Sequence, residues 1–350
     1  MYDSLVRRGL LLGAAMALAG CQFLGGLEAK ELVAGDAGTD GGALEPDAAP
    51  ADDGGTDTDA TAPCGAAPVL DDVPNNVPPP DSRAKSSWTV DRAKGTVFDP
   101  LTGLTWTDAP LAPRTFDDAT CACAALRVGG FSDFRLASRY ELIGILDYDK
   151  VIPEVDGPAI DTSVFRDVAI DYYWTATRYA SSNPAQVAVP WLVGIGDGRA
   201  VGASQTGKTK GPAWCVRGGT AKSGARFEAK TETVRDSYTG LVWQRVLPSK
   251  TWPRLLTPEI DAACAALTLD GDTGFRVPTV KELQTLVLAG KRAPAIDDVA
   301  FPNTGTKLFH ASPHYANPSS SNNWSVDFVD GRSYPNSGSQ EMNVRCVRKP

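Results

Sequence analysis

Residues 237–244 read SYTGLVWQ, and residues 100–107 of the same chain read PLTGLTWT. Both stretches carry Thr-Gly-Leu with a tryptophan two positions after the leucine, and further matches follow in the same order. These are a Cys-Ala-Ala-Leu segment with an arginine and Glu-Leu beyond it, the tetrapeptide PAID, a tryptophan followed by Asp-Gly-Arg, and a closing Cys-Val-Arg. The distance between matched residues stays between 131 and 141 residues. A repeat of this length predicts two tandem globular modules, copy one and copy two, rather than a solenoid.

Composition separates an acidic segment from a nearly neutral remainder. The chain of 350 residues is 42% hydrophobic and contains 8 Trp, which is enough for packed cores. Its formal net charge of -8 comes from residues 22–82, where thirteen Asp or Glu accompany Lys30 alone. Residues 83–217 hold fifteen basic and fifteen acidic residues, and residues 218–350 hold sixteen and thirteen. The folded part is therefore slightly basic, and we expect no nucleic-acid partner.

Residues 1–20 have the features of an export signal. Two arginines precede the apolar run GLLLGAAMALAG, which is shorter than the roughly 20 residues that span a bilayer. The ending Leu18-Ala19-Gly20-Cys21 resembles the bacterial lipobox, which implies cleavage before the cysteine and acylation of its thiol. The alternative is an ordinary secretory signal with a cysteine near its cleavage site. Gln22 favours an outer-membrane lipoprotein, bound to the membrane through its N-terminal lipid and facing the periplasm or the cell surface.

Residues 21–84 have the composition of a disordered tether. Gly, Ala, Asp, Thr and Pro dominate, as in AGDAGTDGGALEPDAAPADDGGTDTDATAP, and the segment is strongly acidic. Such a stretch cannot bury enough apolar surface to offset the entropy lost on ordering. We expect it to hold the modules at a distance from the membrane.

Two helices are expected in each module. The first carries the repeated cysteine, and the second begins at Ser138 in copy one and at Thr279 in copy two. Each of these residues is followed three positions later by a glutamate, which is the pattern of a capping box. Glu141 and Glu282 are therefore interpreted as helix caps in preference to a pair of catalytic acids.

Six cysteines follow Cys21, and an exported protein is expected to oxidise them. Because what pairs in one copy should pair in the other, the repeat predicts Cys123 with Cys215 and Cys264 with Cys346. Cys64 and Cys121 have no counterparts in the second copy. They are candidates to pair with each other and fasten the tether to copy one.

The whole pattern resembles a known family. The order of TGLxW, a cysteine-bearing helix, FRVPTVKEL, PAID, WSVDFVDG and VRCVR is similar to DUF1566, which is also named for the C-terminal domain of the Legionella collagen-like adhesin. We place the modules at residues 85–218 and 226–350. The resemblance implies an α+β fold of two tandem C-type-lectin-like modules, each with two helices and short antiparallel strands. Copy two is the closer match, because copy one has FRLASRYEL and WLVGIGDGR at the corresponding places.

The sequence favours a protein without catalysis, cofactor or metal. His310 and His314 could share a helix face, but Pro313 argues against a helix there, and no acidic or cysteine ligand lies at a suitable spacing. No nucleophile elbow, phosphate-binding loop or Cys/His pair is present in the sequence. An enzyme is the less favoured class.

A binding module fits better, with a glycan or another envelope component as its partner. The repeated tryptophan with Asp-Gly-Arg offers an aromatic face and hydrogen-bonding groups beside a turn. The alternatives are that this pattern is a hairpin turn with a core tryptophan, and that the chain is a structural or assembly lipoprotein with no small ligand. We expect copy two to dominate, with Arg332 donating to a sulfate or carboxylate. The candidate ligand residues are Trp324, Asp327, Asp330 and Arg332, with Trp191, Asp197 and Arg199 in copy one.

Overall fold

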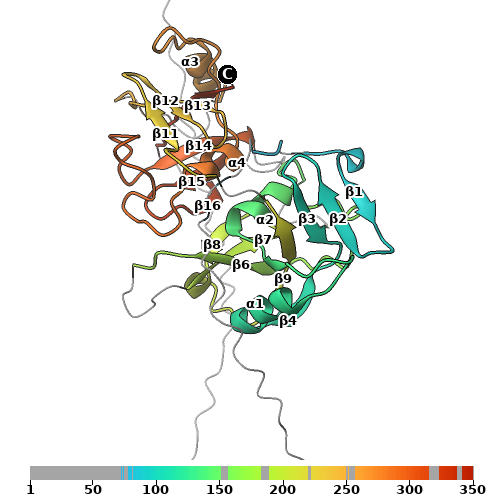
Figure 1. Cartoon of the computed structure of the whole chain (residues 1–350). Helices are drawn as coiled ribbons and strands as arrows, with labels where there is room; N and C mark the ends of the chain where they lie inside the picture. The colour runs from blue at the N-terminus through green and yellow to red at the C-terminus, as the bar shows by residue number, and fades with distance from the viewer. Residues whose placement is uncertain are drawn as a thin grey trace, which may run out of the picture. The chain divides into compact units, whose positions relative to one another are not determined.

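The computed structural model is mostly β-structure (Figure 1). It describes residues 72, 74, 78–80, 82–150, 157–182, 189–219, 222–249, 251, 257–314, 323–336 and 341–349. Their strands form sheets of five, four and eight strands, whereas the four α-helices of this part have only 10, 7, 9 and 6 residues. The expected α+β pair of lectin-like modules is therefore wrong. Its helices exist, but they are too short to form a layer, and strands carry the architecture.

Each copy has one sheet of its own. In copy one the strand order is β1 (Thr89–Asp91), β2 (Thr96–Asp99), β3 (Leu104–Thr107), β10 (Cys215–Gly218) and β5 (Arg135–Leu136). In copy two it is β11 (Phe227–Ala229), β12 (Thr233–Asp236), β13 (Val242–Gln244) and β17 (Val347–Arg348). The neighbouring strands of both sheets pair antiparallel, and corresponding strands occupy corresponding places.

The repeated TGLxW segment forms the hairpin that the sequence predicts. Gly103 and Gly240 end the turns with φ of 71° and 74°, a region that glycine enters without steric cost. Each glycine N–H donates to the carbonyl of the aspartate four residues earlier, Asp99 at 2.8 Å and Asp236 at 2.7 Å. The leucine and tryptophan that follow are buried in both copies.

The third sheet runs through both copies. Its order is β14 (Leu308–His314), β15 (Asn323–Asp327), β16 (Ser333–Asn336), β8 (Ala200–Gly202), β7 (Pro190–Gly194), β6 (Tyr172–Arg178), β9 (Gly211–Ala213) and β4 (Leu111–Arg114). The first three strands belong to copy two and the others to copy one. The copies are thus not independent domains but halves of one unit.

The junction within this sheet relates the copies by a local two-fold axis. Strand β16 pairs antiparallel with β8, and Ser333 lies opposite Ala200 (Figure 1). These two residues each follow the Asp-Gly-Arg of their own copy, so a residue pairs with its own equivalent. Antiparallel pairing of equivalents is what a two-fold axis through the pair produces, as in an isologous dimer. The chain therefore folds as an intramolecular pseudo-dimer.

The helices form where the capping residues predict. They are α1 (Phe116–Ala125), α2 (Arg139–Ile145), α3 (Thr257–Ala265) and α4 (Val280–Thr285), with short 3-10 turns η1 (Lys85–Ser87) and η2 (Ala203–Gln205). Both predicted capping boxes are confirmed: the Ser138 Oγ accepts from the Glu141 N–H at 3.2 Å, and the Thr279 hydroxyl accepts from the Glu282 N–H at 3.1 Å. The equivalent helices α2 and α4 pack against each other.

Both predicted module disulfides are present, Cys123–Cys215 and Cys264–Cys346. Each lies in a small separate core that joins the first helix to the last strand of its copy. Cys121 is also disulfide-bonded. Cys64 and Cys21 lie outside the described residues, so the expected Cys64–Cys121 pair stays a prediction.

One large hydrophobic core serves both copies. It contains the fully buried Trp106, Trp191 and Trp214 of copy one together with Trp243 and Trp324 of copy two. No helix among the described ranges is long and apolar enough to cross a membrane. The export signal falls outside those ranges, as does most of the tether.

The last part of the expected tether belongs to the fold. Pro74, Pro78 and Pro79 are buried, and the Asp72 side chain is only 2% exposed. The expectation of a disordered tether up to residue 84 is therefore corrected at these positions, which are buried against the folded copies, whereas Pro80 and Ser82 are exposed. We call residues 72, 74, 78–80 and 82 the strap.

Candidate functional site

The repeated tryptophans of the expected ligand site lie in the core. Trp191 on β7 and Trp324 on β15 are both 0% exposed. The Trp191 ring packs edge-on against Tyr179, with 4.8 Å between ring centroids, and Trp324 packs edge-on against Tyr148 at 5.0 Å. Neither ring offers a face to a sugar, so the aromatic platform predicted from sequence is wrong. The alternative interpretation, a core tryptophan beside a turn, describes both.

The Asp-Gly-Arg of copy two forms a polar cluster across the two copies. The Asp330 side chain is 2% exposed and accepts from the Tyr179 hydroxyl of copy one at 2.9 Å. Arg292 and Arg332 form ion pairs with the same carboxylate at 3.4 Å and 2.8 Å. Burial and the negative charge of Asp330 raise the pKa of Tyr179 to about 12, so this hydroxyl stays a donor. We call Tyr179, Arg292, Asp330 and Arg332 the inter-copy cluster.

The remaining candidate residues also have partners within the protein. Asp327 accepts from the Val329 N–H at 2.8 Å, and burial raises its pKa. In copy one, Asp197 accepts from the Tyr172 hydroxyl at 2.5 Å, and Arg199 lies 3.7 Å from the same carboxylate. These contacts shape turns and join strands, which leaves the repeated Asp-Gly-Arg little capacity for a ligand.

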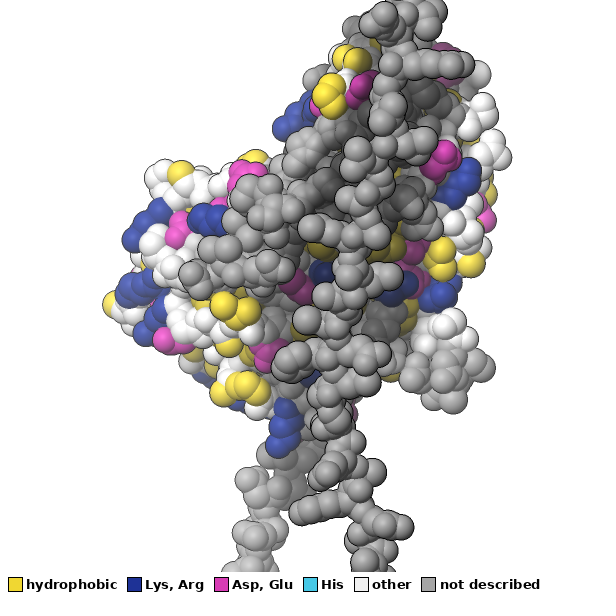
Figure 2. All heavy atoms as spheres, turned by 180° about the vertical axis from the view of Figure 1, so that it is seen from behind, with side chains coloured by type: hydrophobic (Ala, Val, Ile, Leu, Met, Phe, Trp, Pro, Cys, Tyr) yellow, Lys and Arg dark blue, Asp and Glu magenta, His cyan; other side chains and the backbone are white. Residues whose placement is uncertain are grey.

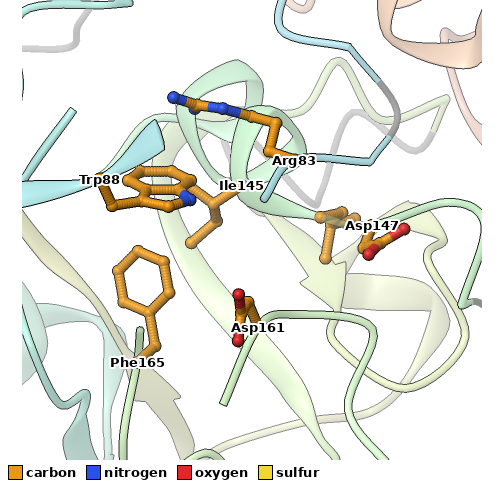
Figure 3. A pocket seen from close by; sticks show the side chains of 7 residues that line it. Arg83, Trp88, Ile145, Asp147, Asp161 and Phe165 are labelled. Carbon is orange, nitrogen blue, oxygen red and sulfur yellow. The ribbon is translucent and has the colours of Figure 1, made fainter. Parts of the chain in front are cut away.

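A small pocket in copy one has different properties (Figure 3). Its volume is about 10 Å³, room for one water-sized group. Trp88 and Phe165 form one side, packed edge-on with 5.3 Å between ring centroids. The pocket is lined by Arg83, Trp88, Ile145, Leu146, Asp147, Asp161 and Phe165.

The pocket presents one donor and one acceptor to its interior. Trp88 is 9% exposed, and its indole Nε1–H has no hydrogen-bond partner in the protein. Figure 3 shows this nitrogen and the Asp161 carboxylate directed toward the same space. Asp161 is held in place because its Oδ1 accepts from the N–H and the hydroxyl of Ser163, at 2.9 and 2.6 Å. An unpaired buried donor is costly, so a group that accepts from it would be stabilised there.

Arg83 closes the pocket without supplying a free charge. Its guanidinium lies 3.9 Å from the centre of the Trp88 ring and donates twice to Asp99, at 2.9 and 2.7 Å. Asp147 on the opposite rim accepts from the Ser82 hydroxyl at 3.1 Å and pairs with Lys150 at 3.0 Å. Because Asp99 balances the charge of Arg83, the Asp161 carboxylate makes the interior of the pocket negatively charged.

Copy two keeps the frame of this pocket and the PAID aspartate, Asp297, but lacks the indole donor and the second aspartate. Arg226 pairs with Asp236 as Arg83 does with Asp99, and it lies over Phe227, which packs edge-on against Phe301 at 5.2 Å. Phe227 thus stands where copy one has the indole N–H. Leu288 replaces Asp147, with its N–H bonded to the PAID alanine in the same manner. The donor of the pocket is therefore a feature of copy one alone.

The histidines and paired glutamates considered from the sequence have identifiable places in the structure. No group of three or more His, Cys, Asp or Glu in this part of the chain could hold a metal ion. His310 lies on strand β14 rather than on a helix and is 3% exposed. Glu141 and Glu282 are engaged as caps, and each also binds an arginine through two hydrogen bonds, to Arg135 and Arg276.

The surface charges are mixed. On the face shown in Figure 2, the Lys and Arg side chains of the described residues are interspersed with Asp and Glu. The described residues visible on this face therefore form no broad basic area that would attract a sulfated polymer, which fits the pairing of Arg332 with Asp330.

Comparison with protein families matches both copies. The model described as the Lcl C-terminal domain matches residues 95–217 and 232–348, more than half of the chain. The chain belongs to the Lcl C-terminal domain family. No curated protein matches it. The family resemblance inferred from TGLxW, PAID and the closing Cys-Val-Arg is thus confirmed.

The pocket combines residues of the Lcl domain with residues outside it. Asp147, Asp161 and Phe165 lie within the first matched segment, whereas Arg83 and Trp88 precede it. Sequence reasoning noted Asp161 only as part of the repeated PAID and missed Trp88. A comparison of the copies could have pointed to Trp88. Copy one has this tryptophan just before its first hairpin, where copy two has Phe227.

Proposed function

We propose that this member of the Lcl C-terminal domain family is a non-catalytic binding protein whose copy one takes a hydroxyl group of a neutral sugar. The observation that supports the proposal is the unpaired Trp88 N–H facing the same small space as the Asp161 carboxylate. A hydroxyl accepts from the first and donates to the second, and it would take the place of a water molecule that can do the same.

The size and charge of the pocket narrow the ligand further. A space of about 10 Å³ admits a hydroxyl but no sugar ring, so the ring would rest on the rim. A sulfate or carboxylate would approach Asp161 with like charge, and an ammonium has no acceptor for the Trp88 N–H. This proposal replaces the anionic sugar and the dominance of copy two that the sequence suggested.

The proposed setting is the outer membrane. Leu18-Ala19-Gly20-Cys21 supports a lipid anchor on the cysteine, with the copies facing the periplasm or the cell surface. Replacing Cys21 by alanine should abolish fatty-acid labelling and release the protein from membranes. Labelling that persists in this variant would refute the anchor.

The binding test is a calorimetric titration with neutral, amino and sulfated oligosaccharides. Trp88→Phe installs the side chain that copy two uses and removes the indole N–H together with one ring of the indole, so we expect affinity for a neutral sugar to fall by at least the hydrogen bond's about 1–2 kcal/mol, roughly 5- to 30-fold. Asp161→Asn should weaken binding similarly, because the amide keeps the turn but loses the charge. Asp297→Asn is the matched control at the same position of PAID in copy two.

Three outcomes would contradict the proposal. Unchanged affinity in Trp88→Phe would mean that the pocket does not hold the sugar. Preference for sulfated sugars would favour an arginine site such as Arg332. Absence of binding to the whole panel would leave the alternative, a structural or assembly lipoprotein.

A further inference from the structure

We propose that the strap controls the pocket, so that its seating between the two copies sets the position of Trp88 and the affinity for ligand. This inference rests on the proposed function for its ligand, but not for its structural readout. It is carried by a chain of contacts that begins at Asp72, crosses helices α2 and α4, and ends in the pocket wall.

The first contact neutralises a buried cation. Arg139, the first residue of α2, has a fully buried side chain, and its Nε donates to the Asp72 carboxylate at 2.5 Å. The other oxygen of Asp72 accepts from the Tyr140 N–H at 3.0 Å. A buried arginine without a carboxylate is strongly unfavourable, so Asp72 holds the strap on α2.

The second contact joins the strap to copy two. Lys281 on α4 has no exposed surface, and its ammonium donates to the Pro80 carbonyl at 2.8 Å and to the Gly144 carbonyl of α2 at 3.2 Å. Gly144 also lies beside Pro79, because a Cβ added there would be 3.6 Å from its Cγ. The strap therefore completes the packing of the helices that relate the two copies.

The third contact reaches the pocket. Two residues beyond Pro80, the Ser82 hydroxyl donates to Asp147, and the next residue, Arg83, stacks on Trp88 and pairs with Asp99. The last residue of the strap thus holds Asp147, and Arg83, which follows it directly, holds the Trp88 ring. If the strap dissociates from the helices, the contact between Ser82 and Asp147 that holds the chain next to Arg83 is lost.

The residues that hold the strap occur only once in the duplicated chain. Arg139 and Lys281 have Val280 and Tyr140 as their equivalents in the other copy. The cations that bind the strap are therefore not repeated. Because coupling between two sites is reciprocal, a ligand in the pocket should also hold the strap more firmly.

The experiment uses the full chain labelled with 5-fluorotryptophan, in which Trp88→Phe assigns the Trp88 signal. Asp72→Asn removes the carboxylate that faces Arg139, whose remaining donors stay on Gln284, and Lys281→Met removes the donor to the Pro80 carbonyl. Either change should speed hydrogen exchange of the peptide containing Ser82 and shift the Trp88 fluorine signal. The signal of Trp243, which is fully buried in copy two, should stay in place. The control is Asp91→Asn at the end of β1, which breaks an exposed ion pair with Lys94.

Two results would overturn the proposal: faster exchange with an unmoved Trp88 signal, or unchanged exchange in both variants. If the fluorine signal of Trp243 keeps its native chemical shift in each variant, the change reflects dissociation of the strap and not general unfolding. Neither readout needs a sugar, so failure to bind sugar would remove the proposed function without touching this coupling. Where a sugar binds, its affinity should fall at least about threefold in Asp72→Asn.

Discussion

Replacing Asp330 by asparagine tests whether the Asp-Gly-Arg turn of copy two holds the copies together. Asparagine keeps an oxygen for the Arg332 N–H, which Asp330 Oδ1 accepts at 3.3 Å, so the turn should survive. What is lost is the charge that receives the Tyr179 hydroxyl and pairs with Arg292 and Arg332. The equivalent change in copy one, Asp197→Asn, is the matched control.

The expected cost follows from burial. A hydrogen bond to a charged group contributes about 1.5–3 kcal/mol when buried, and Asp330 is 2% exposed. The two arginines are 24% and 32% exposed, so each ion pair adds only a few tenths of a kcal/mol to about 1 kcal/mol. Because asparagine still accepts from Tyr179, we expect a net loss of about 2–3 kcal/mol. Asp197 is 24% exposed with its one cation 3.7 Å away, and should lose about 1 kcal/mol.

The assay is urea unfolding followed by tryptophan fluorescence and circular dichroism. Asp330→Asn should lower the free energy of unfolding by the larger amount and the Tm by about 5–10 °C. An equal or larger cost for Asp197→Asn would refute the argument, because it would mean that contacts between the copies add nothing beyond the turn. If Asp330→Asn left stability unchanged but abolished sugar binding, Asp330 would be a ligand-binding residue, as the sequence suggested.

Three further predictions concern stability. Replacing Cys264 and Cys346 by serine opens a loop of 82 residues and should cost about 4–5 kcal/mol, measured by urea unfolding against the untreated parent. Burial raises the pKa of Asp327 above 3.8, so its ionisation opposes folding; the stability of Asp327→Asn relative to the parent should rise between about pH 3 and pH 6, and a fall would contradict it. Gly331→Ala places a Cβ 2.3 Å from a valine methyl and should cost more than Gly240→Ala, which meets nothing within 4 Å.

The local features were predictable because their causes are local. The hairpin needs Gly103 at positive φ, and the capping boxes need a hydroxyl and a glutamate three residues apart. The disulfides followed from the repeat, because Cys123 and Cys215 have counterparts at equivalent positions. In each case a few neighbouring residues, or their repetition in the second copy, are sufficient to determine the feature.

The shared sheet and the strap could not be predicted in this way. Strand β8 reads only Ala-Val-Gly, and its pairing with β16 depends on which edges the two folded copies leave open. The strap consists of four prolines with Asp72 and Ser82, a composition that by itself favours disorder. Its order comes from Arg139 and Lys281, whose burial between α2 and α4 is a property of the assembled copies.

Duplication accounts for both the symmetry and the division of roles. A two-fold arrangement requires both copies to keep the elements on the axis, β8 with β16 and α2 with α4, and these are preserved. Positions away from the axis are free to differ, and there copy one has Trp88 and Asp147 where copy two has Phe227 and Leu288. Copy two thus completes the sheet and the helix pair of copy one and supplies Lys281 to the strap. On this argument the copy closer to the family pattern is the structural half, and the divergent copy is the one in which we propose the ligand pocket.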